Sequence, residues 1–233
     1  MGIVLLTEDG SHTLEDERTG ETYHSIYGAV QESRHIFIER GLKEAFHKAE
    51  KPASLKELKI FEVGFGTGLN AFLTWMEAER SEISIRYTSV ELYPVEQSEW
   101  EKLNYESILN NESANEHINW PKPSFQLLHT CSWGTFHQLS SHFSFRKLQV
   151  DFTHYFPDMH YDLIYFDAFS PEKQPELWLP ERFATLAQHC NPGAILTTYC
   201  AKGIVKQALR DADFTVERLK GPPGKRHMLR GRL

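Results

Sequence analysis

Long apolar runs, a cysteine framework and an excess of positive charge are all missing from this sequence of 233 residues. No uninterrupted apolar stretch approaches the roughly 18 to 20 residues that span a bilayer, so we expect no membrane association. The first ten residues are too short and too uncharged for a secretory signal. The 3 cysteines share no metal-ligand or disulfide spacing, which predicts a cytoplasmic protein.

Charge is distributed unevenly along the chain. The net charge of −7, taken alone, argues against a nucleic-acid partner. From residue 202 to the end, however, nine basic residues stand against three acidic ones. Such a basic segment either marks a face for a polyanion or forms a solvated edge of helix and strand. The 12 histidines include no pair at three- or four-residue spacing, so no metal site is predicted.

Apolar strands alternate with amphipathic helices from residue 58 onward. Segments 214–220 and 227–233 flank a GPPG turn and are expected to form an antiparallel hairpin. The alternation predicts a Rossmann-like α/β fold with a mostly parallel sheet that ends in this hairpin. The other predicted strands are 58–63, 85–91, 147–152, 162–169 and 194–200, and the predicted helices are 69–80, 94–109, 180–189 and 207–211.

Residues 1–57 lack this alternation and are rich in polar residues and turns. We expect them to form an N-terminal extension packed on a core domain of residues 58–233. Within the extension, short strands are predicted at 22–27 and 35–38 and a helix at 42–51. Segment 110–146 has the weakest pattern, with one candidate strand at 125–129.

A glycine-rich loop, EVGFGTG, follows the first core strand and contains Gly64, Gly66 and Gly68. Glycines here let the backbone turn sharply and let a ligand lie against the main chain. A dinucleotide-binding loop would have a small residue in place of Leu69. The G-x-G-x-G spacing, with Glu62 two residues ahead, is typical of S-adenosylmethionine methyltransferases, because an acid can hold the cationic end of that cofactor. A plain strand–helix turn is the alternative.

Further cofactor contacts are predicted at successive strand ends, where ligands of open α/β sheets bind. Glu91 ends the second strand, where a carboxylate accepts from both ribose hydroxyls. Asp151 ends the third and suits the adenine amino group. Asn70, in the first turn of the helix after the glycine loop, completes the predicted cofactor site. For each acid taken alone, a helix cap or surface charge is the alternative.

The fourth strand runs into the segment DAFSPEKQPELW. An aspartate at a strand end, followed by an aromatic residue and a proline, is an arrangement that nitrogen-methylating enzymes use. The carboxylate accepts a hydrogen bond from the target nitrogen, and the aromatic ring packs against the substrate. Asp167 is therefore the candidate catalytic residue, and Phe169, Ser170 and Pro171 are candidate substrate-binding residues.

These segments resemble the methyltransferase half of the MnmC family, which acts in tRNA methylaminomethyl-2-thiouridine biosynthesis. The similarity lies in FEVGFGTGLNAFL, DAFSPEKQPELW, YCAKGIVKQALRDADFTVERLKGPPGKRHML and, near the start, YHSIYGAVQESRHIFIERGL. It implies a class I S-adenosylmethionine-dependent methyltransferase that methylates the aminomethyl nitrogen of a wobble uridine in the tRNA anticodon loop. It also implies that Tyr23 and Glu32 cap the cofactor or substrate.

In that reaction Asp167 either takes a proton from the amine or orients its lone pair. An unperturbed aspartate has a pKa near 3.9 and is a poor base at pH 7, which favours orientation. Lys202, Lys225 and Arg226 are predicted to contact tRNA phosphates.

The resemblance also bears on partners and on alternatives. Members of the family often carry a flavin-dependent oxidase half, whereas this sequence has no second dinucleotide loop. We therefore expect a stand-alone methyltransferase without FAD, and dependence on a separate flavin-dependent oxidase remains open. A methyltransferase of the same fold that acts on a small-molecule or protein amine is one alternative. A non-catalytic adenosylmethionine-binding regulator is another.

Overall fold

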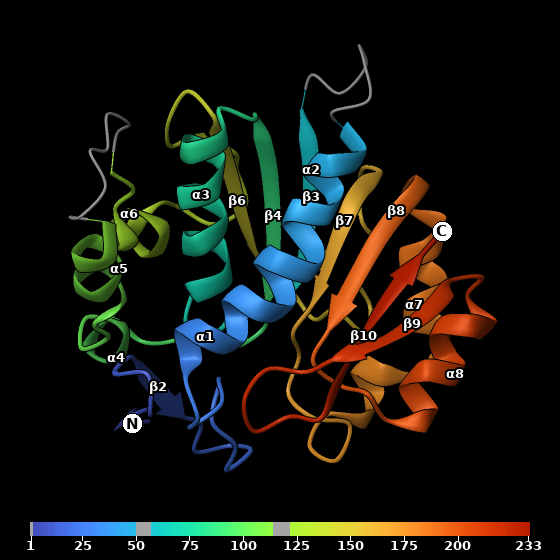
Figure 1. Cartoon of the computed structure of the whole chain (residues 1–233), viewed down its shortest axis with the longest axis horizontal. Helices are drawn as coiled ribbons and strands as arrows, with labels where there is room; N and C mark the ends of the chain where they lie inside the picture. Colours follow the sequence, from blue (N-terminus) through green and yellow to red (C-terminus); the bar gives the residue numbers. More distant parts are fainter. Residues whose placement is uncertain (1, 50–56, 114–121) are drawn as a thin grey trace.

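A central eight-stranded sheet organises the computed structural model, which describes residues 2–49, 57–113 and 122–233 (Figure 1). The strands are β3 (Leu58–Val63), β4 (Ile85–Glu91), β5 (His137–Gln138), β6 (Phe143–Gln149), β7 (Tyr161–Phe166), β8 (Cys190–Thr198), β9 (Thr215–Lys220) and β10 (His227–Arg232). Their order across the sheet is β5-β6-β4-β3-β7-β8-β10-β9.

Strands β6, β4, β3, β7 and β8 run parallel to one another. Strand β10 is antiparallel to both β8 and β9, and β5 is antiparallel to β6. This arrangement confirms the predicted mostly parallel sheet with its terminal antiparallel hairpin. Strands β3 and β7 are buried at nearly every position, because helices cover both faces of the sheet.

Two hydrophobic clusters pack on opposite faces of the sheet. Ile60 and Phe61, neighbours on β3 that point to opposite faces, belong to different clusters. The helices are α1 (Ala29–Ser33), the π-helix η1 (Arg34–Leu42), α2 (Lys43–Ala49), α3 (Leu69–Ser81), α4 (Gln97–Trp100), α5 (Tyr105–Ser113), α6 (Phe125–Thr130), the 3₁₀ helix η2 (Pro175–Trp178), α7 (Pro180–Gln188) and α8 (Gly203–Asp211). The cluster of Ile60 includes residues of η1 and α3, and that of Phe61 includes residues of α7 and α8.

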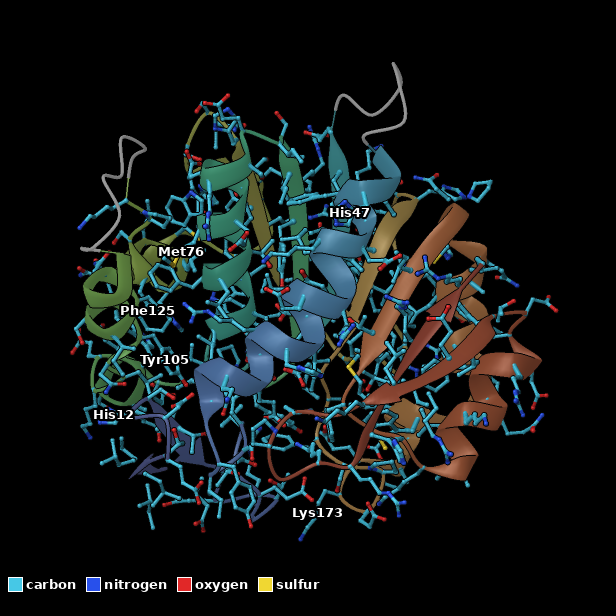
Figure 2. All side chains as sticks on the ribbon, viewed as in Figure 1. His12, His47, Met76, Tyr105, Phe125 and Lys173 are labelled. Atoms are coloured by element: carbon cyan, nitrogen blue, oxygen red, sulfur yellow. The ribbon has the colours of Figure 1, made fainter. Side chains whose placement is uncertain are left out.

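Aromatic rings fill much of the space between the sheet and the helices in front of it. Trp75 of α3 stacks on Phe143 of β6, with ring centroids 5.5 Å apart, and Phe143 in turn stacks on Phe145 at 6.1 Å. Further out, Tyr105 of α5 and Phe125 of α6 pack edge to face at 5.5 Å (Figure 2). These rings fix α3, and with it the preceding glycine loop, against the sheet.

The N-terminal segment differs from its predicted secondary structure. Strands β1 (Ile3–Leu6) and β2 (His12–Glu15) form a separate two-stranded sheet. The predicted strand at 22–27 is wrong, since only Thr22 makes an isolated bridge there. The predicted strand at 35–38 is also wrong: this apolar run lies in η1, which continues α1 and packs on α3 and β8, so tertiary packing overrides its strand propensity. Helix α2 occupies part of the predicted 42–51 helix, of which residues 50 and 51 lie outside the described residues.

Two predictions in the middle of the chain are corrected as well. Segment 125–129 is helical rather than extended, because the Ser124 hydroxyl caps the helix by accepting from the Leu127 amide, and Phe125 and Leu128 are buried one turn apart. The predicted helix at 94–109 is divided into α4 and α5. In the part of the chain that the structure describes, no helix is both long and apolar enough to cross a membrane.

The aromatic stack yields a stability prediction. Phe143 is wholly buried between Trp75 and Phe145, so Phe143→Ala leaves a cavity in the core and is expected to lower the free energy of unfolding by about 3–5 kcal/mol. Urea unfolding followed by circular dichroism measures the loss. Phe156→Ala is the matched control: its side chain is 62% exposed, so a change within about 0.5 kcal/mol is expected. Equal losses in the two variants would contradict the prediction.

Candidate functional site

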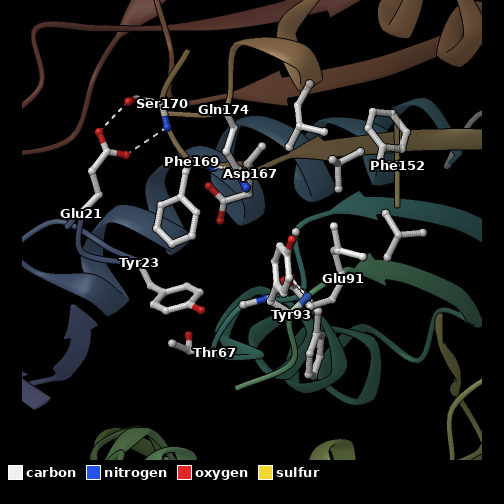
Figure 3. Close-up of a pocket in the computed structure, with 18 of the residues that line it drawn as sticks. Glu21, Tyr23, Thr67, Glu91, Tyr93, Phe152, Asp167, Phe169, Ser170 and Gln174 are labelled. Carbon is white, nitrogen blue, oxygen red and sulfur yellow. Dashed lines mark hydrogen bonds between the residues drawn. The ribbon is translucent and has the colours of Figure 1, made fainter. Parts of the chain in front are cut away.

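A cavity of about 490 Å³ lies at the carboxyl ends of the central parallel strands (Figure 3). Strand β3 lies between β4 and β7, so the connections that follow β3 and β7 run to opposite sides of the sheet. A crevice for a ligand forms at the carboxyl ends of the strands where such connections diverge. Nine of the predicted site residues line this cavity, namely Gly64, Gly66, Asn70, Glu91, Asp151, Asp167, Phe169, Ser170 and Lys225.

The glycine loop forms one wall because it packs closely on its neighbours. Gly64 has a φ of 92°, and a Cβ there would lie 2.6 Å from the carbonyl oxygen of Asp167. The Asp167 amide in turn donates to the carbonyl of Val63 at 2.9 Å. Gly66 has a φ of 50°, and its Cβ would meet the ring of Tyr23 at 2.9 Å. Larger residues at either position would displace the cavity wall.

Glu91 is fixed at the end of β4 by two backbone amides. Its carboxylate accepts from Gly66 N at 3.0 Å and from Tyr93 N at 2.9 Å. Burial raises the pKa of Glu91 above its ordinary value, against the effect of these hydrogen bonds. The carboxylate thus joins the glycine loop to the next strand and presents acceptor oxygens at the cavity wall.

Asp151 lies in the loop after β6, because β6 ends at Gln149 rather than at residue 152 as predicted. The Asp151 carboxylate accepts from the amide of Thr153 at 2.8 Å and from its hydroxyl at 2.6 Å. The hydroxyl hydrogen bond is the main cause that lowers the pKa of Asp151. The side chain is therefore an ionised acceptor on the cavity wall near Phe152.

Glu62 and Asn70 supply buried acceptors next to Asp167. The Glu62 carboxyl accepts from the Ser89 hydroxyl at 2.7 Å, and burial raises its pKa to about 8. The amide nitrogen of Asn70 donates to Asp167 Oδ2 at 2.7 Å. Among the described residues, Glu62 Oε1 and Asn70 Oδ1 are buried without a hydrogen-bond partner. Unpaired buried acceptors are costly unless a ligand or water satisfies them, which makes Asn70 Oδ1, on a cavity-lining residue, a candidate ligand contact.

Asp167 is a carboxyl group that changes protonation near neutral pH. Burial raises its pKa to about 7, and the charge of Glu32 adds to the rise, while the Asn70 hydrogen bond and the charge of Lys225 oppose it. The expectation of an ordinary aspartate pKa at this position is therefore wrong, because that expectation took no account of burial. A carboxyl with this pKa can accept a proton at pH 7.

Three further side chains surround Asp167 and together with it define the charged end of the cavity. Lys225, from the turn between β9 and β10, forms an ion pair with buried Glu32 of α1. The Lys225 ammonium also lies 4.6 Å from the ring centroid of Tyr199, whose hydroxyl donates to the Ala168 carbonyl at 2.9 Å. Glu32 and Tyr23, which the resemblance assigned to a cap, both line the cavity.

Residues 18–25 of the N-terminal segment close the cavity from the side opposite the sheet (Figure 3). The Glu21 carboxylate accepts from both the amide and the hydroxyl of Ser170. The ring centroids of Tyr23 and Phe169 lie 5.0 Å apart. The N-terminal wall is thus attached to the segment after β7 that carries the predicted substrate-binding residues.

Sequence reasoning missed several residues of this wall. The guanidinium of Arg18 lies 4.0 Å from the ring centroid of Tyr93. His24 Nε2 lies 2.9 Å from the Thr67 hydroxyl, and burial lowers the His24 pKa to about 4, so the imidazole is neutral at pH 7. Arg18 and Glu21 belong to no motif, and their neighbours in space are distant in sequence, so no local signal marks them. His24 lies in the resembling segment that begins at Tyr23, but no role is predicted for it.

Five predicted residues lie outside the set that lines the cavity: Glu62, Gly68, Pro171, Lys202 and Arg226. Lys202 is exposed and forms an ion pair with Glu172. Arg226 is exposed beside Lys225. In residues 2–49, 57–113 and 122–233, no group of three or more His, Cys, Asp or Glu side chains could hold a metal ion.

A family model and two curated relatives all relate this chain to methyltransferases or to MnmC proteins. Residues 146–233 match a family described as S-adenosyl-L-methionine-dependent methyltransferase. The chain is 32% identical over 224 residues to the tRNA 5-methylaminomethyl-2-thiouridine biosynthesis bifunctional protein MnmC of Chromohalobacter salexigens, covering 92% of this chain and 30% of that protein. It is 30% identical over 238 residues to the MnmC protein of Marinobacter nauticus, covering 98% of this chain and 36% of that protein.

The chain thus spans about a third of the length of these curated relatives. Among solved structures, the crystal structure of MnmC2 from Aquifex aeolicus shares the fold with a TM-score of 0.74 and 22% identity, covering 99% of this chain and 70% of that one. The chain is therefore an S-adenosylmethionine-dependent methyltransferase, related along nearly its whole length to the MnmC proteins.

Proposed function

We propose that the chain transfers the methyl group of S-adenosylmethionine to the aminomethyl nitrogen of the modified wobble uridine in the tRNA anticodon loop. The observation that carries the proposal is Asp167, a half-buried carboxyl beside the glycine loop on the cavity wall, whose pKa is raised to about 7 by the exclusion of water. A carboxyl there suits an amine as the methyl acceptor. The names of the MnmC relatives concern tRNA 5-methylaminomethyl-2-thiouridine biosynthesis, which supports tRNA as the substrate.

The residues present fit S-adenosylmethionine, which supplies a methyl group on a sulfonium. Asn70 Oδ1, a buried acceptor without a partner in the described residues, suits the ammonium of its amino-acid end. Glu91 is assigned to the ribose hydroxyls and Asp151 to the adenine amino group. Gly64 and Gly66 allow close approach of the backbone. Glu62 of β3 and Gly68 of the loop lie outside the set of residues that lines the cavity.

Asp167 prepares the methyl acceptor. A primary alkylamine is largely protonated at neutral pH, and its nitrogen is nucleophilic only after one proton has left. One carboxylate oxygen of Asp167 is held by Asn70, so the other is free to take that proton or to accept an N–H of the amine. Because the pKa of Asp167 is raised to about 7, proton transfer is as feasible here as orientation.

The remaining substrate contacts surround the target base. A wobble base is easily splayed from a single-stranded loop, and Phe169 offers a ring on which it stacks, with Ser170 and Pro171 next to it. Exposed Lys202 and Arg226 are assigned to tRNA phosphates. Lys225 takes a different part, because it faces the cavity. A separate flavin-dependent oxidase is the partner that would supply the aminomethyl group.

Replacement of the catalytic carboxyl tests the assignment directly. Asp167→Asn is expected to lower kcat on aminomethyl tRNA by about 10²-fold or more with little effect on tRNA binding, because an amide cannot take the proton. In the unaltered enzyme, kcat should rise as pH increases through about 7, where Asp167 loses its proton. Asp211→Asn, at an exposed position of α8, is the control and should keep full activity. Near-normal turnover of Asp167→Asn would exclude the mechanism.

Glu91→Gln tests the ribose site. The variant keeps the size of the side chain but loses the charge that binds two amides and, in the proposal, the ribose hydroxyls. Affinity for S-adenosylmethionine is expected to fall about 10- to 100-fold. Isothermal titration calorimetry measures it, and an unchanged dissociation constant would remove Glu91 from the cofactor site.

Arg226→Ala tests the phosphate contact. Loss of one phosphate contact should raise KM for tRNA and reduce the slope of log KM against log salt by about 1. Lys102→Ala removes an equal charge from an exposed position outside the cavity and should leave the slope unchanged. If Arg226→Ala and Lys102→Ala give the same slope as the unaltered enzyme, Arg226 does not contact tRNA.

A further inference from the structure

The charged end of the cavity contains an ion pair that the mechanism above does not use. Glu32 of α1 binds the ammonium of Lys225 with one carboxylate oxygen and accepts from the Ser25 amide with the other, at 2.7 Å. Glu32 is only 6% exposed. Both residues line the same cavity as Asp167. A charged pair inside a binding cavity acts on the charge of whatever binds there.

The side chain of Lys225 is fixed in place by its neighbours, unlike a mobile lysine on the protein surface. Its ammonium is bound by Glu32 and lies 4.6 Å from the ring centroid of Tyr199, a cation–π distance. The Tyr199 ring is itself fixed by its hydroxyl, which donates to the Ala168 carbonyl directly after Asp167. The next residue, Arg226, points to solvent instead. Of these two adjacent basic residues, Lys225 thus faces the cavity and Arg226 faces solvent.

We propose that the Glu32–Lys225 pair fixes the net charge of this end of the cavity at −1, so that it accepts a singly charged primary amine. The inference rests on the proposed function and deepens it. Glu32 contributes −1 and Lys225 +1, and these cancel. The charge of Asp167 remains where this carboxyl is ionised, above about pH 7, and it matches one ammonium. Glu32 and Lys225 are positioning residues, since they act on the amine through Asp167.

The other groups that face Asp167 leave this balance unchanged at pH 7. Asn70 of α3 carries no charge. Burial keeps Glu62 of β3 largely protonated, with a pKa of about 8, and His24 of the N-terminal wall neutral, with a pKa of about 4. Burial also holds the pKa of Tyr199 well above its ordinary value, so its hydroxyl is neutral. Among the residues that the structure describes, Glu32 and Lys225 are therefore the charged groups that act on Asp167 at neutral pH.

Removal of either member of the pair should shift the titration of Asp167, in opposite directions. Without Lys225, two carboxylates face each other, protonation of Asp167 becomes easier, and the acid limb of activity moves to higher pH. Without the charge of Glu32, the Lys225 ammonium is uncompensated, the acid limb moves to lower pH, and the incoming ammonium is repelled. Asp167 is active as the carboxylate, so the limb follows its pKa in both cases.

The experiment is the pH dependence of kcat/KM for methylation of aminomethyl tRNA by Lys225→Met, Glu32→Gln and the double variant. The acid limb is the low-pH part of this profile, where kcat/KM rises with pH. We expect its midpoint to move about one pH unit higher in Lys225→Met and about one unit lower in Glu32→Gln. The double variant should return close to the unaltered limb, because the two charges are lost together. Where turnover is slow, single-turnover transfer of a radiolabelled methyl group gives the same limb.

Two controls separate charge from folding and from the proposed function. Lys225→Arg keeps the charge and should keep the limb, and Lys102→Met removes a distant exposed charge and should not move it. Shifts of Lys225→Met and Glu32→Gln in the same direction, no shift, or a double variant no closer to the unaltered limb would overturn the inference. If the unaltered enzyme does not methylate aminomethyl tRNA at all, the proposed function fails instead.

Discussion

The close approach of Gly64 to Asp167 is the contact on which the site depends. Parallel pairing of β3 with β7 brings the two strand ends together, and the Asp167 amide binds the carbonyl of Val63 there. The absence of a side chain at Gly64 lets the two segments meet. As a result, the glycine loop and the Asp167 carboxyl share one wall of the cavity. In the proposed function, this wall brings a cofactor at the loop close to an acceptor at Asp167 without any flexible connection.

Burial then gives the residues their chemical character. Asp167, Glu62 and His24 each have a pKa shifted toward the neutral form, mainly because their surroundings exclude water. Burial raises the pKa of Glu91 as well. The carboxylates of Glu91 and Asp151 are also fixed in place by hydrogen bonds from backbone amides and, for Asp151, from a hydroxyl. The cavity therefore combines fixed acceptors at one set of strand ends with a titratable carboxyl at another. Both come from the same sheet edge.

Much of the sheet and the glycine loop can be predicted from the sequence, whereas of the N-terminal wall only Tyr23 is predicted, through the resemblance. Strand β3, LKIFEV, is buried at nearly every position and is mostly apolar in sequence, and the loop after it has a recognisable glycine spacing. The Glu21–Ser170 contact joins residues 149 positions apart, which leaves no local pattern. Residues 35–38 show the limit in another way. Their β-branched and aromatic side chains favour a strand, but packing on α3 and β8 makes them helical.

The wall formed by residues 18–25 means that the binding cavity is not contained in the methyltransferase fold alone. The hydrogen bonds of Glu21 to Ser170 and the contact of Tyr23 with Phe169 make the beginning of the chain part of the active site. A fragment that starts at β3 would contain the eight strands of the sheet and the glycine loop, yet it would lack one side of the cavity and the helix η1 that packs on α3 and β8. The alternating strand–helix pattern and the wall of the cavity therefore have different boundaries along the chain.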